Sequence, residues 1–274
     1  MNQDTLTFGR LVDALRPWFP VVVFIGGWAH RLHRQHPLAR NLAYAPLMTN
    51  DGDVAINPMD FPATDRIRPR LLEREFVEDL TGEDTPPVTY YRFRERTNPH
   101  YAEFLVPLIG GEYKRDGTRD ATTRVGDVSA QKLRYLELLF VSPWILELKP
   151  GEIPLEAPAA IRIPNPASYL AQKILIHGHR KPSDRAKDTL YVHDTLETFA
   201  DALPGIRRTW LERVRPTLGE RQVRRIEAAA GHLEGGISDE IREATIQARA
   251  VGRDLSAERL MQVCAYGLRE IFGP

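Results

Sequence analysis

Two short elements in a fixed order constrain this chain more than any other feature of its sequence. Residues 21–25 form a continuous apolar run, which favours a buried strand, and the run ends at Gly26 and Gly27. A helix can start at these glycines and continue through residues 28–33. Farther along, Asp51-Gly52-Asp53 leads into the apolar residues 54–56, which is typical of a second strand. The pattern predicts strand, Gly-Gly turn, helix and strand, in that order.

The chemistry of the two elements is complementary. Two glycines at a helix start leave the backbone N–H groups unobstructed at the positive end of the helix dipole, which suits a triphosphate. Asp51 and Asp53, at i and i+2 on a strand, point from the same face, so both can hold a divalent metal near those phosphates. Taken alone, Asp51-Gly52-Asp53 favours a solvated turn, because Asp and Gly are turn formers. Together with Gly26 and Gly27, it favours a site for metal-assisted phosphoryl or nucleotidyl transfer.

Composition narrows the class of protein. The 274 residues carry 37 Lys and Arg against 37 Asp and Glu, so the net charge is zero and a strongly basic nucleic-acid-binding domain is excluded. The single cysteine, Cys264, excludes an intramolecular disulfide framework and fits a reducing compartment. The first residues lack the basic start and apolar core of a signal peptide, and the apolar run 19–29 is too short to span a bilayer. We therefore expect a soluble, cytoplasmic protein without a membrane partner.

The chain changes character near residue 160. Before it we expect a helix over 5–19, a solvated connection or helix over 60–84, a hairpin of 88–94 and 101–108, and two strands within 133–148; glycines and charges fill 110–127. After it, Asn165 caps a helix and Pro166 takes its first turn. Further helices are expected over 183–201, 204–217, 219–233, 237–251 and 256–271.

Several stretches resemble the DNA polymerase β-type nucleotidyltransferase superfamily, and more narrowly the minimal nucleotidyltransferases that include the AbiE-type toxins of type IV toxin–antitoxin systems. They are VVVFIGGWAHRLH, LMTNDGDVAI, YAEFLVPL and IRIPNPASYLAQKILIHGHRKPSDRAKDTLYV, which touch most of residues 20–195. The resemblance implies an α+β fold with a mixed β-sheet and flanking helices. It also implies a catalytic domain over 1–160 and a helical domain over 161–274 that closes the nucleotide cleft.

Within that family a Gly-Ser or Gly-Gly turn holds the phosphates, an Asp-x-Asp motif binds the metals, and a carboxylate on a later strand completes the site. By resemblance these roles fall to Gly26 and Gly27 and to Asp51 and Asp53, with Mg²⁺ as cofactor. The sequence departs from the pattern in three ways. Gly27 stands where many members have serine, Gly52 replaces an aliphatic residue, and the interval between the two motifs is long, so that 33–46 would be an insertion.

Glu103 is the third carboxylate that we expect. Ala102, Phe104 and Val106 share one face of a predicted strand, and Glu103 points to the other face. A carboxylate within an apolar strand needs partners, and a metal would provide one. The alternative is an edge-strand glutamate that meets solvent or Arg92. Asp127 is a poorer candidate because its surroundings are typical of a loop.

Lys173 lies on the first helix after residue 165, among apolar neighbours. The resemblance implies that a lysine here contacts the nucleotide phosphates and that Lys187 and Asp188 belong to the rim of the site. A lysine would offset the negative charge of three carboxylates and a triphosphate. The alternatives are a solvated face for Lys181 and Arg185, and an ordinary ion pair of Asp188 with Arg185 or Lys187.

Three further groups of residues lie outside this predicted site. His30, His33 and His36 lack a neighbouring carboxylate or cysteine at ligand spacing, so we expect surface or interface positions rather than a zinc site. Cys264, in an apolar helix, is expected in the core. The third group is a set of seven arginines in a short helical region. They form either a surface for a nucleic acid or an acidic partner, or an ordinary solvated helix face. They are Arg207, Arg208, Arg213, Arg215, Arg221, Arg224 and Arg225.

The sequence thus predicts a magnesium-dependent nucleotidyltransferase that uses an NTP and a hydroxyl acceptor, which is a tRNA, a protein or a small molecule. A toxin role would add an antitoxin protein as partner. Two alternatives remain: a catalytically degenerate module that binds a nucleotide or a partner protein, and a structural module that binds an antitoxin or regulator without Asp51 and Asp53.

Overall fold

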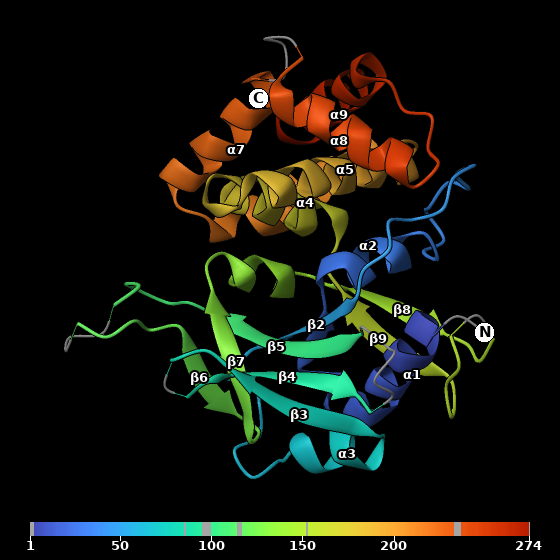
Figure 1. Ribbon diagram of the computed structural model, residues 1–274. Coiled ribbons are helices and arrows are strands. Elements are labelled where there is room, and N and C mark those ends of the chain that lie inside the picture. Colours follow the sequence, from blue (N-terminus) through green and yellow to red (C-terminus); the bar gives the residue numbers. More distant parts are fainter. Residues whose placement is uncertain are drawn as a thin grey trace. The chain divides into compact units, whose positions relative to one another are not determined.

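The computed structural model describes residues 3–84, 86–94, 100–113, 117–151, 153–232 and 237–273. The chain divides into two compact units, one of residues 1–29 with 48–164 and one of residues 30–47 with 165–274. The architecture is α+β, as the sequence predicts, with a mixed sheet and C-terminal helices (Figure 1). None of the described helices combines the length and the apolar character needed to cross a membrane. The expected domains, 1–160 and 161–274, stay a prediction.

The first unit is built on a mixed β-sheet. In the described residues its main path runs in the order β1-β2-β5-β4-β3, and β7 pairs with both β5 and β6. β2 and β7 are parallel to β5, whereas β4 is antiparallel to it. The strands are β1 (Val22–Phe24), β2 (Asp51–Ile56), β3 (Phe76–Thr81), β4 (Val88–Phe93), β5 (Tyr101–Pro107), β6 (Thr122–Val125) and β7 (Val128–Leu133). β5 therefore lies in the interior of the sheet, where its apolar residues are buried.

Helices and a second hairpin complete this unit. The predicted helix over 5–19 is observed as α1 (Gln3–Leu15) followed by a 3₁₀ turn, η1 (Arg16–Trp18). α1 packs Phe8 flat on Trp28, with ring centroids 3.8 Å apart. α2 (Gly26–His33) begins at the two glycines, as predicted. The other elements are α3 (Arg68–Glu73), η2 (Leu136–Phe140) and the antiparallel pair β8 (Trp144–Leu148) and β9 (Ala159–Ile163).

The predicted strand pattern is wrong in three places. Within 60–84 the chain forms not only a helix but also β3, an acidic strand that pairs only with β4 among the described residues. No strand was predicted between residues 108 and 133, but this stretch includes β6 and β7. The first apolar run of 133–148 is the 3₁₀ helix η2, because Tyr135 takes a left-handed conformation (φ 61°) and ends β7. The predicted hairpin of β4 and β5 is confirmed, and its connection at 95–99 lies outside the described residues.

The second unit is helical. Asn165 caps its first helix as predicted, with the side chain accepting the Ser168 N–H at 2.9 Å. The elements are α4 (Pro166–Ile176), η3 (His177–His179), α5 (Pro182–Thr198), α6 (Leu203–Thr209), the π-helical turn η4 (Trp210–Val214), η5 (Arg215–Thr217), α7 (Glu220–His232), α8 (Asp239–Ala250) and α9 (Ala257–Phe272). α5 packs against α8 and α9, and α7 packs against α4 and α9.

Candidate active site

Three carboxylates share one face of the sheet in the first unit. Asp51 and Asp53 lie two residues apart on β2, so their side chains leave the strand on the same side. The parallel register pairs Asp53 with Glu103 on β5, and Asp51 with Tyr101. Because paired residues on adjacent strands point to the same face, Glu103 joins the two aspartates. The structure thus brings these three predicted residues onto adjoining positions of one surface.

Glu103 is not an edge-strand residue. β5 is paired with β2 and β4 on its two sides, and Arg92 makes its ion pair with Asp79 at 2.7 Å instead. Burial and the negative charge of Asp51 raise the pKa of Glu103 to about 7, against the effect of a hydrogen bond from Tyr101. Within the part of the chain that the structure describes, no cationic side chain pairs with Glu103, and a bound metal would relieve this electrostatic condition.

The predicted phosphate turn lies directly against Asp53. Gly26 has φ +62°, and a Cβ added to it would lie 1.9 Å from Asp53 Oδ2, so a side chain here would be strained and would displace Asp53. The Ile25 N–H also donates to the Asp53 carbonyl oxygen at 2.9 Å. The start of α2, with its positive dipole end, is therefore held beside the carboxylate face.

The two glycine departures are explained by packing. A Cβ on Gly27 would lie 2.6 Å from the Cβ of Thr49, which is buried and whose hydroxyl donates to Asp51. A Cβ on Gly52 would lie 2.8 Å from Leu11 Cδ2 of α1, on the face of β2 opposite the aspartates. Both glycines thus allow a close approach that a side chain would prevent.

We expect Gly27→Ser, which introduces the commoner family residue, to destabilise this protein. Overpacking against Thr49 should lower the free energy of unfolding by about 1–3 kcal/mol, as measured by urea denaturation. Thr49→Gly removes the obstructing Cβ, so the double variant should lose less stability than the sum of the two single variants. Additive losses would show that Thr49 does not dictate glycine at position 27.

Asp51, Asp53 and Glu103 supply only carboxylate oxygens, which are the ligands that a hard divalent cation prefers. The strand register also places the three residues on one face of the sheet. Their side chains do not converge as they stand. Within the described ranges, no three His, Cys, Asp or Glu side chains form a group that could hold a metal. Asp51 accepts a hydrogen bond from Thr49, and Glu103 accepts one from Gln131 Nε2 at 3.3 Å. Side-chain rotation away from these two donors would be needed for all three carboxylates to reach one ion.

A family model described as nucleotidyltransferase matches residues 6–212. The chain belongs to this family. The match includes Gly26, Gly27 and all three carboxylates, and it supports transfer of a nucleoside monophosphate from an NTP in general. Nucleotidyltransferases generally use divalent metals. No curated protein and no solved structure matches the chain.

The second unit of this nucleotidyltransferase holds the other predicted residues. Lys173 is buried as its apolar neighbours indicated, and its Nζ lies 2.6 Å from Asp188 Oδ1. Asp188 also accepts from Arg180 Nε at 3.1 Å, so its ion-pair partners are Lys173 and Arg180 rather than Arg185 or Lys187, the partners that the alternative interpretation named. Burial explains the difference, because Asp188 faces the interior beside α4, where Lys173 reaches it. Lys187 Nζ instead lies 5.6 Å from the centre of the Tyr191 ring.

Lys173 and Asp188 line a cavity of about 350 Å³ inside this helical unit. Apolar side chains form much of its wall, including Val192 and Leu268. At its polar side the His177 Nε2 lies 3.1 Å from a Glu240 oxygen. The cavity therefore combines an apolar surface with a histidine–glutamate contact and one ion pair, and the ion pair contains predicted nucleotide-binding residues.

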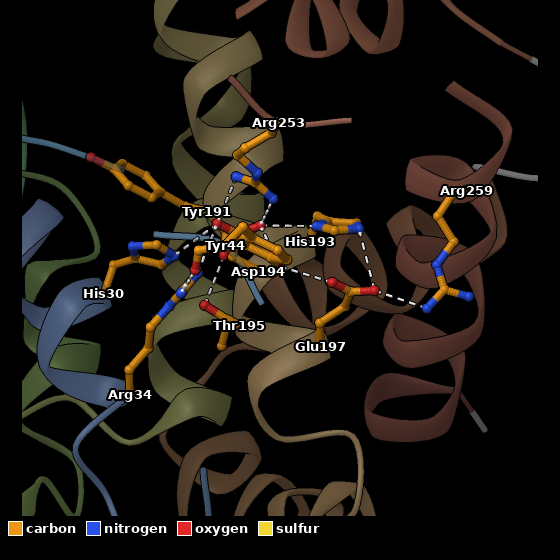
Figure 2. Close-up of polar contacts among 10 residues, drawn as sticks. All are labelled: His30, Arg34, Tyr44, Tyr191, His193, Asp194, Thr195, Glu197, Arg253 and Arg259. Carbon is orange, nitrogen blue, oxygen red and sulfur yellow. Dashed lines mark hydrogen bonds and ion pairs between the residues drawn. The ribbon is translucent and has the colours of Figure 1, made fainter. Parts of the chain in front are cut away.

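A buried charge cluster around Asp194 was not predicted (Figure 2). Asp194 is fully buried and accepts both guanidinium nitrogens of Arg253, at 2.6 and 2.9 Å. His193 Nδ1 lies 2.9 Å from the carboxylate, and His30 Nε2 lies 3.6 Å from it. Burial opposes ionisation, but the contacts with His193, the nearby His30 and the hydrogen bonds from Arg253 outweigh it and hold the pKa of Asp194 far below its usual range. One feature of the sequence indicated that Asp194 is buried: it follows the apolar residue Leu190 by one helical turn.

The cluster fixes a long irregular segment to the helical unit. Tyr44 donates its hydroxyl proton to Glu197 at 2.8 Å, and the same oxygen lies 3.2 Å from Asp194 Oδ1 (Figure 2). The centre of its ring lies 3.9 Å from the Arg253 guanidinium carbon. Arg40 pairs with Asp201, again between this segment and the end of α5. Residues 30–47 consequently form part of the second unit.

Three smaller predictions are resolved by the same structure. His30 and His33 are buried rather than at a surface, because both pack against aromatic rings within the helical unit, and burial lowers the pKa of His30. Cys264 is buried in the core as predicted, and burial raises the pKa of its thiol. Asp127 occupies a turn with φ +66° and accepts the backbone N–H groups of Ile67 and Arg68, which is a structural role.

Proposed function

We propose that this chain is a magnesium-dependent enzyme that transfers a nucleoside monophosphate from an NTP to a hydroxyl acceptor. Asp51, Asp53 and Glu103 would hold the metal. The observation that carries the proposal is the parallel register of β2 and β5, which pairs Asp53 with Glu103 beside the glycine turn. This arrangement supplies carboxylate oxygens and a helix start side by side, as a metal-bound triphosphate requires.

Each residue has a definite role in the proposal. The backbone at Gly26 and Gly27 binds the β and γ phosphates at the start of α2. Bound magnesium would neutralise the leaving pyrophosphate and lower the pKa of the acceptor hydroxyl. The acceptor oxygen would attack the α-phosphorus as its proton passes to a solvent water molecule, and the bond to pyrophosphate would break with its electron pair leaving on the pyrophosphate oxygen. Burial and the charge of Asp51 raise the pKa of Glu103 to about 7, so a bound cation would favour its ionised form.

The helical part contributes Lys173, Lys187 and Asp188 as nucleotide-binding residues, a role that the resemblance implies. Asp188 pairs with the buried Lys173 ammonium group at 2.6 Å and would orient it. The wider setting rests on the resemblance alone: a cytoplasmic enzyme, a tRNA, protein or small-molecule acceptor, and a toxin role with an antitoxin partner.

Binding of the four ribonucleoside triphosphates, with and without Mg²⁺, tests this proposal by calorimetry. Magnesium-dependent binding of at least one NTP is expected, and Asp51→Asn should weaken it by at least about 10–100-fold, the range found for lesser changes around metal sites. Asp79→Asn is the matched control, because Asp79 is a partly exposed residue of β3 that pairs with Arg92. The same loss in both variants, or none in Asp51→Asn, would contradict the assignment.

The second candidate function is a module that binds a nucleotide or a partner without turnover. It is favoured by one observation: Thr49 and Gln131 engage two of the three carboxylates. Magnesium-dependent NTP binding with no label transferred to RNA, protein or small molecules in a cell extract would support it.

A further inference from the structure

The zero net charge of the chain conceals an uneven distribution. The second unit, residues 30–47 and 165–274, contains 20 Lys and Arg side chains against 15 Asp and Glu, which leaves five positive charges. The first unit carries the equal negative excess. A domain-level charge of this size attracts polyanions even when the whole chain is neutral.

One stretch of the second unit accounts for the whole excess. Residues 207–225 contain seven arginines, two glutamates and no lysine. They run through α6, η4, η5 and the first turns of α7, which Figure 1 shows as an orange helix of this unit. Arginine binds phosphate through two parallel N–H groups and is weakly hydrated, so an all-arginine stretch is better suited to phosphodiesters than a mixed basic one.

Five of the seven arginines are available at the surface. Arg207 and Arg225 are used by the fold, since they donate to the carbonyl oxygens of Gly273 at 2.8 Å and Leu175 at 3.0 Å. The other five are exposed, and we call them the arginine surface: Arg208, Arg213, Arg215, Arg221 and Arg224.

Most of this charge is uncompensated. Arg208, Arg213 and Arg221 make no ion pair or hydrogen bond with any described residue. Arg215 and Arg224 pair with Glu227 at 3.6 Å and with Glu220 at 3.2 Å, and such exposed pairs contribute little. Ligand phosphates can therefore reach all five guanidinium groups without breaking a buried contact.

We propose that the arginine surface binds the phosphate backbone of a nucleic acid that serves as the acceptor, an inference that rests on the proposed nucleotidyl transfer. Leu211 is the one large apolar side chain exposed within 207–225. Protein interfaces need a buried apolar centre, whereas nucleic-acid interfaces are polar and strongly basic. The surface therefore fits a nucleic acid better than an acidic protein.

Fluorescence anisotropy with a labelled RNA hairpin, titrated at several salt concentrations, tests the inference. The triple variant Arg208→Gln, Arg213→Gln, Arg221→Gln should bind the hairpin about 10–100-fold more weakly at low salt, and the slope of log K against log salt should fall by about 3, one per lost phosphate contact. The control removes three exposed arginines elsewhere in the unit: Arg242→Gln, Arg249→Gln and Arg269→Gln. A DNA hairpin of the same sequence separates backbone binding from recognition of the 2′-hydroxyl.

Each outcome decides between explanations. Equal weakening in the triple variant and its control, or no weakening in either, would overturn the inference. The inference would also be overturned if the triple variant binds RNA as the wild type does but no longer binds phosphatidylserine vesicles, which represent a membrane, or polyglutamate, which represents an acidic protein. NTP binding with Mg²⁺ is measured in the same proteins. If NTP binding is intact but RNA binding does not depend on the arginines, this inference alone is wrong. If RNA binding depends on the arginines but the protein binds no NTP, the proposed enzymatic function is wrong.

Discussion

Asp53→Asn is expected to abolish nucleotidyl transfer while the protein stays folded. The substitution keeps the size of the side chain but removes the charge at the position that is paired with Glu103 and touched by the Gly26 turn. Loss of one preorganised charge at a reacting phosphate lowers kcat by about 10²–10³-fold or more. The measurement is incorporation of label from an α-³²P-labelled NTP into total cellular RNA and protein, at saturating NTP and Mg²⁺.

Two comparisons make this result specific to the site. Asp79→Asn, the same chemical change on a partly exposed strand residue, should retain the wild-type rate. The thermal unfolding temperature of Asp53→Asn should match or exceed that of the wild type, because removing one of three clustered carboxylates relieves repulsion. Retention of the full transfer rate by Asp53→Asn would remove this residue from the site.

The largest loss of stability is expected for Asp194→Asn. The substitution leaves Arg253 buried without its anion and removes the charge toward which Arg34 and both histidines are oriented. Removing one partner of a buried ion pair costs about 3–5 kcal/mol, because the remaining charge is neither solvated nor paired. Urea denaturation followed by tryptophan fluorescence measures the loss, and Trp210 reports on this unit because it is buried there.

The matched control is Asp201→Asn, close to the end of the same helix. Asp201 pairs with Arg40 between the same two segments, but both side chains are largely exposed to solvent. Water can solvate either partner, so we expect a free energy of unfolding close to that of the wild type. A similar loss of unfolding free energy in both variants would indicate that the attachment of residues 30–47 to the helices, rather than the burial of charge, determines the stability of this region.

Local signals predicted the elements that build the site. A short apolar run that ends at two glycines is typical of a buried strand, so residues 21–25 were predicted as one. Asn165 was predicted as a helix cap because its side chain can accept a hydrogen bond from a backbone N–H of the first turn. The common face of Asp51 and Asp53 follows from the two-residue period of a strand, which requires no tertiary information.

The strands that were missed have unusual compositions for a physical reason. β3 carries Glu78 and Asp79 among its six residues, and as the last strand of its path it can leave charged side chains in water. β7 contains Gln131 and Lys132, which are stabilised by partners on other elements: Glu103 for the first and Asp120 for the second. Neither pattern alternates in hydrophobicity strongly enough to be recognised without its neighbours.

By itself, the sequence determined which residues form the candidate site: a glycine turn at a helix start, two aspartates on one face of a strand, and a glutamate within an apolar strand. Only the tertiary structure decided their relation. The register that pairs Asp53 with Glu103 joins strands about 50 positions apart in the sequence, and it depends on how β2 and β5 bury their opposite face under α1. The partners of Asp194 likewise come from α2, α5 and the connection before α9. Contacts between distant segments form because burial must be satisfied across the whole core, and no local pattern contains that information.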